Sequence, residues 1–248
     1  MAPPFAHFRN VSDRDKSKAV QKLITVSTPD YDFFVMVTLS VLMAALGLWI
    51  NSVAIVIGSM LIAPILYPVL SLSLGIVMSD YKLITRSFYT VLKSTAFGII
   101  AAALATWFLA TGYDSLTSEI LARTEPSLLY LAVAVISGIA VSFALVRPEL
   151  SETLAGIAVS VALIPPIAVI GIGIAKFDWA VVAGSTMLFI VNIAGIIFAS
   201  MVSFSLLNLH DKRHIAQTTI QKEEQRVELE HERAEYTEKE SENHGREI

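Results

Sequence analysis

Hydroxyl and amide side chains inside long apolar runs are the groups that could do chemistry in this chain of 248 residues. They are Ser59, Tyr67 and Ser71 around one proline motif, Ser160 before a second motif, and Asn192 in a third run. Such groups bind small solutes or ions, but they supply neither a nucleophile with its base nor a metal ligand set. Two structural roles stay open, because serines also bond to carbonyls of their own helix and asparagine joins helices in membranes.

Two proline motifs must position these groups, one with Pro64 and Pro68 and the other with Pro165 and Pro166. A proline inside a membrane helix removes a backbone donor and clashes with the carbonyl four residues back, which leaves polar groups that lipid cannot satisfy. We therefore expect two broken helices that face a site inside the protein. The candidate substrate-binding residues are Ser59, Pro64, Tyr67, Pro68, Ser71, Ser160, Pro165, Pro166 and Asn192.

Residues for catalysis are missing from the sequence. There is no cysteine, and the five histidines, at positions 7, 210, 214, 231 and 244, all lie outside the apolar runs. No His/Glu metal spacing, glycine-rich phosphate loop or nucleophile elbow occurs. We therefore expect no enzyme activity, no cofactor and no metal site. The apolar runs also lack Asp and Glu, which argues against direct proton coupling through a carboxylate.

Composition places the chain in a membrane, with 54% hydrophobic and 16% charged residues and a mean hydropathy of +0.64. A membrane-spanning helix needs about 20 predominantly apolar residues. Six runs meet or approach that length. They are Phe33 to Ile50, Val53 to Met78, Phe88 to Ala110, Leu128 to Val146, Leu154 to Ala175 and Trp179 to Leu209. The predicted fold class is an all-α polytopic membrane protein with six transmembrane helices.

The two halves of the membrane domain are related as a repeat. When Pro64 is placed over Pro165, Ser59 falls on Ser160, and after a short gap Asp80 falls on Asp178. Each half then has three helices with the proline in the middle one, and an odd number forces the second half to insert from the opposite side. This 3+3 inverted repeat, over residues 29–110 and 126–209, is typical of secondary transporters. The alternative is that proline is common in membrane helices and that any two apolar triplets align loosely.

The basic residues predict the orientation. With the N-terminus inside, Lys and Arg concentrate in the first 28 residues, in the loops 79–87 and 147–152, and directly after residue 209. The outer loops hold only Arg123 and Lys176. The positive-inside rule therefore predicts a multi-pass protein of the inner or plasma membrane with both termini in the cytoplasm.

The two ends of the chain differ from its middle. Residues 1–28 form a basic cytoplasmic segment, residues 29–209 the membrane domain, and residues 210–248 a tail of interleaved acids and bases without proline. The tail can continue the sixth helix as a charged, pair-stabilised helix. Its apolar heptad positions, Ile220, Val227 and Ala234, leave open whether it is solvated or associates with another copy or protein.

The proline motifs also carry a family resemblance. The stretch from Leu46 to Pro68, Arg147-Pro-Glu149, the stretch from Leu154 to Pro166 and Asn192-Ile-Ala-Gly195 resemble the microbial "uncharacterised hydrophobic domain" family, domain of unknown function 389. The resemblance covers about residues 27–209 and implies a six-span membrane domain without a known catalytic residue. Motif positions of structural character are Asn51, Gly58 and Arg147.

Two classes of function remain. The first is a transporter or channel-like protein for a small solute or ion, with a site where the broken helices meet near the midplane. The second is a non-transporting membrane scaffold or regulatory protein that acts through its tail. The expected partners are the lipid bilayer and a small solute or ion, without nucleic acid, and self-association is left open.

Overall fold

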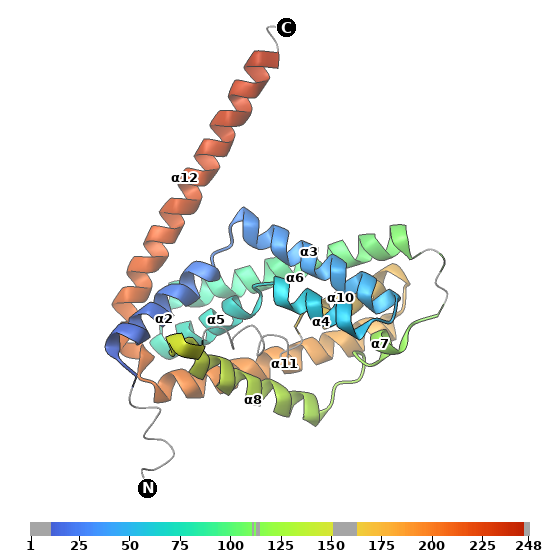
Figure 1. Ribbon diagram of the computed structural model, residues 1–248, viewed down its shortest axis with the longest axis horizontal. Helices are drawn as coiled ribbons and strands as arrows, with labels where there is room; N and C mark the ends of the chain where they lie inside the picture. Colours follow the sequence, from blue (N-terminus) through green and yellow to red (C-terminus); the bar gives the residue numbers. More distant parts are fainter. Residues whose placement is uncertain (1–10, 111, 113–114, 151–162, 246–248) are drawn as a thin grey trace.

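The computed structural model describes residues 11–110, 112, 115–150 and 163–245. All regular structure within these ranges is helical. Figure 1 shows the apolar helices side by side in one bundle, with α2 at one end and α12 extending away from it. In chain order the elements are α2 (Asp13–Val26), α3 (Tyr31–Trp49), α4 (Val53–Ile62), α5 (Leu66–Met78), α6 (Tyr81–Leu109), α7 (Ser118–Leu121), α8 (Leu128–Leu145), η1 (Pro148–Leu150), α10 (Ile164–Ala175), α11 (Trp179–Leu206), η2 (Leu209–Lys212) and α12 (Arg213–Gly245).

Four of these helices, α3, α6, α8 and α11, are long and apolar enough to cross a membrane by length and composition. The pair α4 and α5 passes the same test together, although the two helices meet at an angle of 51°. Helix α10 is apolar but shorter. The chain is therefore a helical membrane protein. Part of the predicted fifth span, residues 154–162, lies outside the described residues.

Aspartates begin three of the membrane helices. Asp30 Oδ1 accepts the Phe33 amide at 2.9 Å at the start of α3, and Asp80 Oδ1 accepts the Leu83 amide at 3.1 Å at the start of α6. Asp178 caps α11, where its side chain accepts the amides of Ala180 and Val181. The Thr28 hydroxyl, two residues before the α3 cap, instead donates to the carbonyl of Ile24 in α2.

The turns after α5 and after α10 have the same geometry. Each consists of a glycine, a left-handed residue four positions later and then the capping aspartate: Gly75, Ser79 and Asp80 in the first turn, and Gly173, Phe177 and Asp178 in the second. In both turns the aspartate amide donates to the glycine carbonyl at 2.9 Å. A Cβ on either glycine would lie 3.0–3.1 Å from a backbone nitrogen of the next helix. Glycine is therefore needed for the close return of the chain.

The packing partners of α5 and α10 also match. Helix α5 packs against α6 and α11, and α10 packs against the same two helices. Helix α10 in addition contacts α3 and α4. The pairs α8 with α11 and α3 with α6 complete the bundle.

The segment before the membrane domain contains a helix, α2, that was not predicted from the sequence. Ser12 caps it, and its buried face consists of Ala19, Val20, Leu23 and Ile24. This helical spacing of apolar residues was the available signal. Helix α2 packs against α5 and α12.

The tail is helical as expected, but it does not continue α11. The chain turns at Asn208, whose φ of 53° is left-handed, and then passes through η2 into α12. Ala216 and Ile220 of α12 are fully buried, and the first part of α12 packs against α2. Ile220, one of the apolar heptad residues of the tail, is thus buried within the same chain.

Candidate functional site

The bend between α4 and α5 lies at Ala63, Pro64 and Ile65, and these residues are called the break region below. Pro64 has no amide hydrogen to donate to α4, and its ring is incompatible with a continuing helix. Ala63 accordingly has an extended backbone, with φ −80° and ψ 127°, as the residue before a proline prefers. Pro68 lies in the first turn of α5, where proline is tolerated. The chain restarts as a helix when the Tyr67 amide bonds to the Pro64 carbonyl at 3.1 Å.

The end of α4 is stabilised from the neighbouring helix. Ser59 lies in the last turn of α4, where the carbonyls have no intrahelical partner. The Ser40 hydroxyl of α3 donates to the Ser59 carbonyl at 2.6 Å, and both serines are fully buried. The Ser59 hydroxyl in turn donates to the Val56 carbonyl at 2.6 Å. In this structure Ser59 therefore presents its carbonyl to Ser40, and its hydroxyl is used within its own helix.

The second proline motif begins a helix. Pro165 and Pro166 lie in the first turn of α10 and are buried. Proline suits this position because its fixed φ matches the helix and its missing donor is not needed there. The expected break in the fifth helix would lie before these prolines, and Ser160 with it, among residues outside the described ranges. The start of α10 enters the bundle, since Ile167 Cγ2 and Val41 Cγ2 both lie against Gly98 of α6.

The remaining candidates fall at different places. Asn192 is in the middle of α11 and only 3% exposed. Tyr67 is half-buried at the start of α5. Ser71 is buried and faces α2, where its hydroxyl lies 2.9 Å from the Ser27 hydroxyl. The contacts of Ser71 therefore belong to the packing of α2 on α5, whereas helices α4 and α10, which adjoin the two proline motifs, are in contact with each other.

The three motif residues of structural character have separate roles. Asn51 adopts a left-handed φ of 56° between α3 and α4, and its side-chain oxygen accepts the Ser118 hydroxyl and the Glu119 amide. Gly58 faces the flexible Met43 side chain, whose terminal carbon would lie 3.1 Å from an added Cβ. The Arg147 guanidinium lies over the Phe143 ring, 4.5 Å from its centroid.

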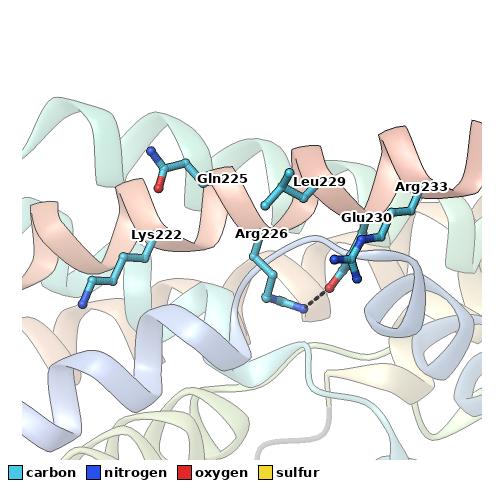
Figure 2. A pocket seen from close by; sticks show the side chains of 6 residues that line it. All are labelled: Lys222, Gln225, Arg226, Leu229, Glu230 and Arg233. Atoms are coloured by element: carbon cyan, nitrogen blue, oxygen red, sulfur yellow. Dashed lines mark hydrogen bonds and ion pairs between the residues drawn. The ribbon is translucent and has the colours of Figure 1, made fainter.

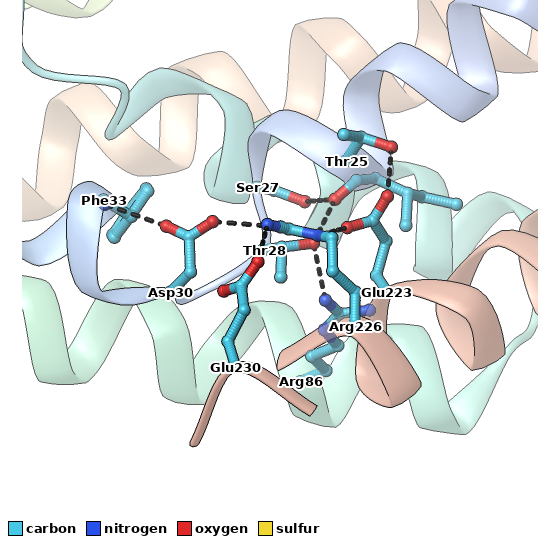
Figure 3. Close-up of polar contacts among 10 residues, drawn as sticks. Thr25, Ser27, Thr28, Asp30, Phe33, Arg86, Glu223, Arg226 and Glu230 are labelled. Carbon is cyan, nitrogen blue, oxygen red and sulfur yellow. Dashed lines mark hydrogen bonds and ion pairs between the residues drawn. The ribbon is translucent and has the colours of Figure 1, made fainter. Parts of the chain in front are cut away.

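A polar junction between α12 and the α2–α3 turn was not anticipated from the sequence. Figure 3 shows Arg226 of α12 pointing into a cluster formed by the α2–α3 turn and α12 itself. Its guanidinium reaches Asp30 at 3.0 Å, Glu223 at 3.0 Å and Glu230 at 2.9 Å. Thr25 of α2 donates to Glu223 at 2.8 Å. The junction ties the tail to the start of α3.

A second set of contacts ties α12 to the start of α6. The carboxylate oxygen of Asp80 that does not cap α6, Oδ2, accepts the Gln217 amide at 3.0 Å and lies 3.5 Å from Arg213. Burial alone would raise the pKa of the Asp80 carboxyl, but bonds from the Leu83 amide and Gln217, together with the Arg213 charge, hold that pKa below its ordinary value. In the junction, hydrogen bonds to Asp30 and Glu223 raise the pKa of Arg226, which also favours its charged form.

A groove also lies beside the junction. It has a volume of about 340 Å³ and runs along α12 (Figure 2), and the exposed Leu229 lies in it among charged side chains. Within the described ranges no cluster of three or more His, Asp or Glu residues could hold a metal ion.

These features define a class: a helical membrane protein with a bent helix pair inside its bundle and a charged helix docked at one end. The chain belongs to the family described as domain of unknown function DUF389, whose family model matches residues 60–198. It is 32% identical over 178 residues to uncharacterized protein MJ0678 of Methanocaldococcus jannaschii. The alignment covers 72% of this chain and 55% of that relative. No solved structure matches the chain.

Proposed function

We propose that the protein is a transporter or channel-like protein for a small solute or ion. The binding site would lie between the break region and the start of α10, with Tyr67 and Asn192 as its polar side chains. One observation carries the proposal: the last turn of α4 contains the fully buried Ser59, α10 begins with buried residues, and these two helices are in contact. Helix ends carry carbonyl and amide groups without intrahelical partners, and membrane transporters use such ends to hold ions and polar solutes.

An inverted repeat fits this function. The matched turns after α5 and α10, and their shared packing partners, support an equivalence between α3–α6 and the half that ends with α11. In the proposed six-span topology both termini are cytoplasmic and the protein lies in the inner or plasma membrane, as the basic residues of the loops favour. Alternating exposure of the central site would follow from movement of one half against the other.

The test is ligand-dependent stability of the purified protein in detergent. A screen of inorganic ions and small metabolites should find a compound that raises the unfolding temperature in proportion to the logarithm of its concentration above its dissociation constant. Asn192→Leu should retain the fold but lose this stabilisation. The same compound should then move across liposomes that contain the wild-type protein.

The matched control is Ser94→Ala on α6, because among the described residues this buried hydroxyl bonds only to carbonyls of its own helix. A response that Ser94→Ala and Asn192→Leu lose equally would contradict the proposed location of the site. If the flux of the compound into protein-free liposomes equals its flux into liposomes that contain the protein, transport of that compound is contradicted.

A second candidate is a scaffold or regulatory protein that acts through α12, without enzymatic activity. The observation in its favour is the length of α12 beyond its docked part, where the side chains of residues 228–235 are exposed. Deletion of residues 228–248 distinguishes the two functions. It should leave ligand-induced stabilisation intact in a transporter, and it should abolish partner capture by a scaffold.

A further inference from the structure

An open cavity lies beneath α12, at the end of the bundle where α6 begins. It has a volume of about 440 Å³, and α12, α6 and the α2–α3 turn each form part of its wall. Thr28 and Arg86 line it on the side of the membrane helices, and Glu224, Glu228 and His231 line it on the side of α12. The cavity is separate from the break region and is not needed for the transport proposal.

The Arg86 guanidinium in this wall has one nitrogen that donates a hydrogen bond and another that donates none to a described residue. Its Nη2 donates to the Thr28 hydroxyl at 2.7 Å (Figure 3). Its Nη1 is buried and has no hydrogen-bond partner within the described part of the chain. A buried charged donor without an acceptor is costly, so an acceptor oxygen supplied by a ligand would be favoured here.

A stripe on α6 continues from this cavity along the bundle. Lys82, Arg86, Tyr89 and Lys93 follow one another at spacings of four, three and four residues, which places them on one face of the helix. Lys82 is paired with Glu224 of α12 at 2.6 Å. Tyr89 is 54% exposed, and Lys93 is also exposed.

Further along the same helix face the stripe becomes apolar. Phe97, Ile100 and Leu104 are each more than half exposed although they belong to a membrane-spanning candidate. These side chains therefore face lipid tails. A ligand with a charged head in the cavity and a hydrocarbon chain along this face would contact both parts of the stripe at once.

The charges of the cavity select among such ligands. Arg86 offers a site for a phosphate, and Lys93 lies within the same face for a second contact. On the opposite wall Glu228 is exposed and makes no ion pair with any described residue. Glu223 and Glu224 add negative charge nearby, although each is already bonded to a basic side chain. This arrangement suits a head group that carries both a phosphate and an amine better than one with net negative charge.

We propose that this cavity is a binding site for an aminophospholipid of the phosphatidylethanolamine type. The phosphate bonds to Arg86, the primary ammonium bonds to Glu228, and an acyl chain lies along Phe97, Ile100 and Leu104. The lipid belongs to the leaflet next to α2 and α12, which is the cytoplasmic leaflet in the proposed topology. It would fill the space between α12 and the membrane helices.

The experiment measures lipid-dependent stability of the delipidated full-length protein in detergent. Phosphatidylethanolamine, phosphatidylcholine and phosphatidylglycerol with identical acyl chains are added at matched concentrations, and the unfolding temperature gives an apparent affinity for each. Phosphatidylethanolamine should bind about tenfold more tightly than the other two, because only it carries both the phosphate and ammonium hydrogens. Free phosphoethanolamine should stabilise the protein far less, since it lacks the chains.

Two variants locate the site. Arg86→Gln should weaken phosphatidylethanolamine binding about tenfold, because the charge-assisted bond to the phosphate is lost. Glu228 is exposed in the cavity wall and pairs with no described residue, so Glu228→Gln should retain the fold, and it should remove the preference for phosphatidylethanolamine over phosphatidylcholine. Glu232→Gln is the matched control on the same helix, outside the cavity lining, and should keep that preference.

Three results would overturn the proposal. One is stronger stabilisation by phosphatidylglycerol than by phosphatidylethanolamine, which would indicate a surface for anionic lipid. Another is an unchanged head-group preference in Glu228→Gln. The third is equal stabilisation by free phosphoethanolamine, which would indicate a soluble ligand in place of a lipid.

Discussion

Ser40 is the residue whose replacement tests most directly how the bend between α4 and α5 is maintained. Its hydroxyl donates at 2.6 Å to the Ser59 carbonyl, in a place where both residues are fully buried. Ser40→Ala removes the hydroxyl without adding bulk. The Ser59 carbonyl, in the last turn of α4, then loses this donor from α3.

The size of the effect follows from two limits. Hydrogen bonds between membrane helices contribute about 0.6 kcal/mol on average and up to about 1.7 kcal/mol. A buried carbonyl without a partner costs about 1–3 kcal/mol. We expect Ser40→Ala to lower the free energy of unfolding by about 1–2 kcal/mol, because the bond is short and water is excluded from it.

Ser73 provides the matched control. It is also a fully buried serine, but its hydroxyl donates to the carbonyl of Val69 in its own helix at 3.1 Å. That carbonyl lies inside α5, where the helical amide four residues later is its regular partner. Ser73→Ala should therefore change the free energy of unfolding by less than about 0.5 kcal/mol.

The assay is reversible unfolding in mixed micelles, with helicity followed against denaturing detergent for the wild type and both variants. Equal losses of stability in Ser40→Ala and Ser73→Ala would refute the reasoning, because the bond across the two helices would then have no special value. The bend would in that case be maintained by Pro64 and apolar packing alone.

Three further predictions concern the charged junction and the turns. Arg226→Met should lower the free energy of unfolding by about 1 kcal/mol in low salt. This value is reduced for solvent screening, because the Arg226 side chain is 42% exposed. Thermal unfolding at high salt should show a smaller difference between the variant and the wild type. The lowered pKa of Asp80 means that its stabilising contribution is present above the ordinary value of 3.8 and disappears as the pH falls through the lower folded value; acid titration of Asp80→Asn should show a smaller loss of stability in that range. Gly173→Ala places a Cβ 2.8 Å from Val182 and should cost about 1–3 kcal/mol in chemical unfolding, whereas Gly112→Ala, with open space around it, should cost little.

Local signals predicted much of the membrane domain. The apolar runs from Leu128 and from Trp179 begin where α8 and α11 begin, since a helix start depends on the cap and the first turn alone. Pro64 lies at the bend for the same reason, because the missing donor is a property of that residue. The third predicted span begins at Phe88 and omits the first turns of α6. That helix begins at Tyr81, and its first turns carry the charged residues Lys82 and Arg86.

Contacts between distant segments could not be predicted in this way. Arg226 and Asp30 are separated by 196 positions, and nothing in the local pattern of the tail distinguishes a docked arginine from a solvated one. The same limit applies to Ser71, whose position near a proline suggested a binding role. Its closest polar partner is Ser27, which follows α2, a helix that was not predicted from the sequence.

The capping aspartates of α3 and α6 show how the tail and the membrane domain depend on each other. In both Asp30 and Asp80 one carboxylate oxygen caps a membrane helix, and the other oxygen binds a side chain of α12. Capping uses only one oxygen of each aspartate, so the bond from the other oxygen to α12 is an additional contact. Because α12 uses Gln217 for one cap and Arg226 for the other, it joins the ends of two helices that also pack against each other. The proximal part of α12, which carries Gln217 and Arg226, is therefore a component of the membrane domain.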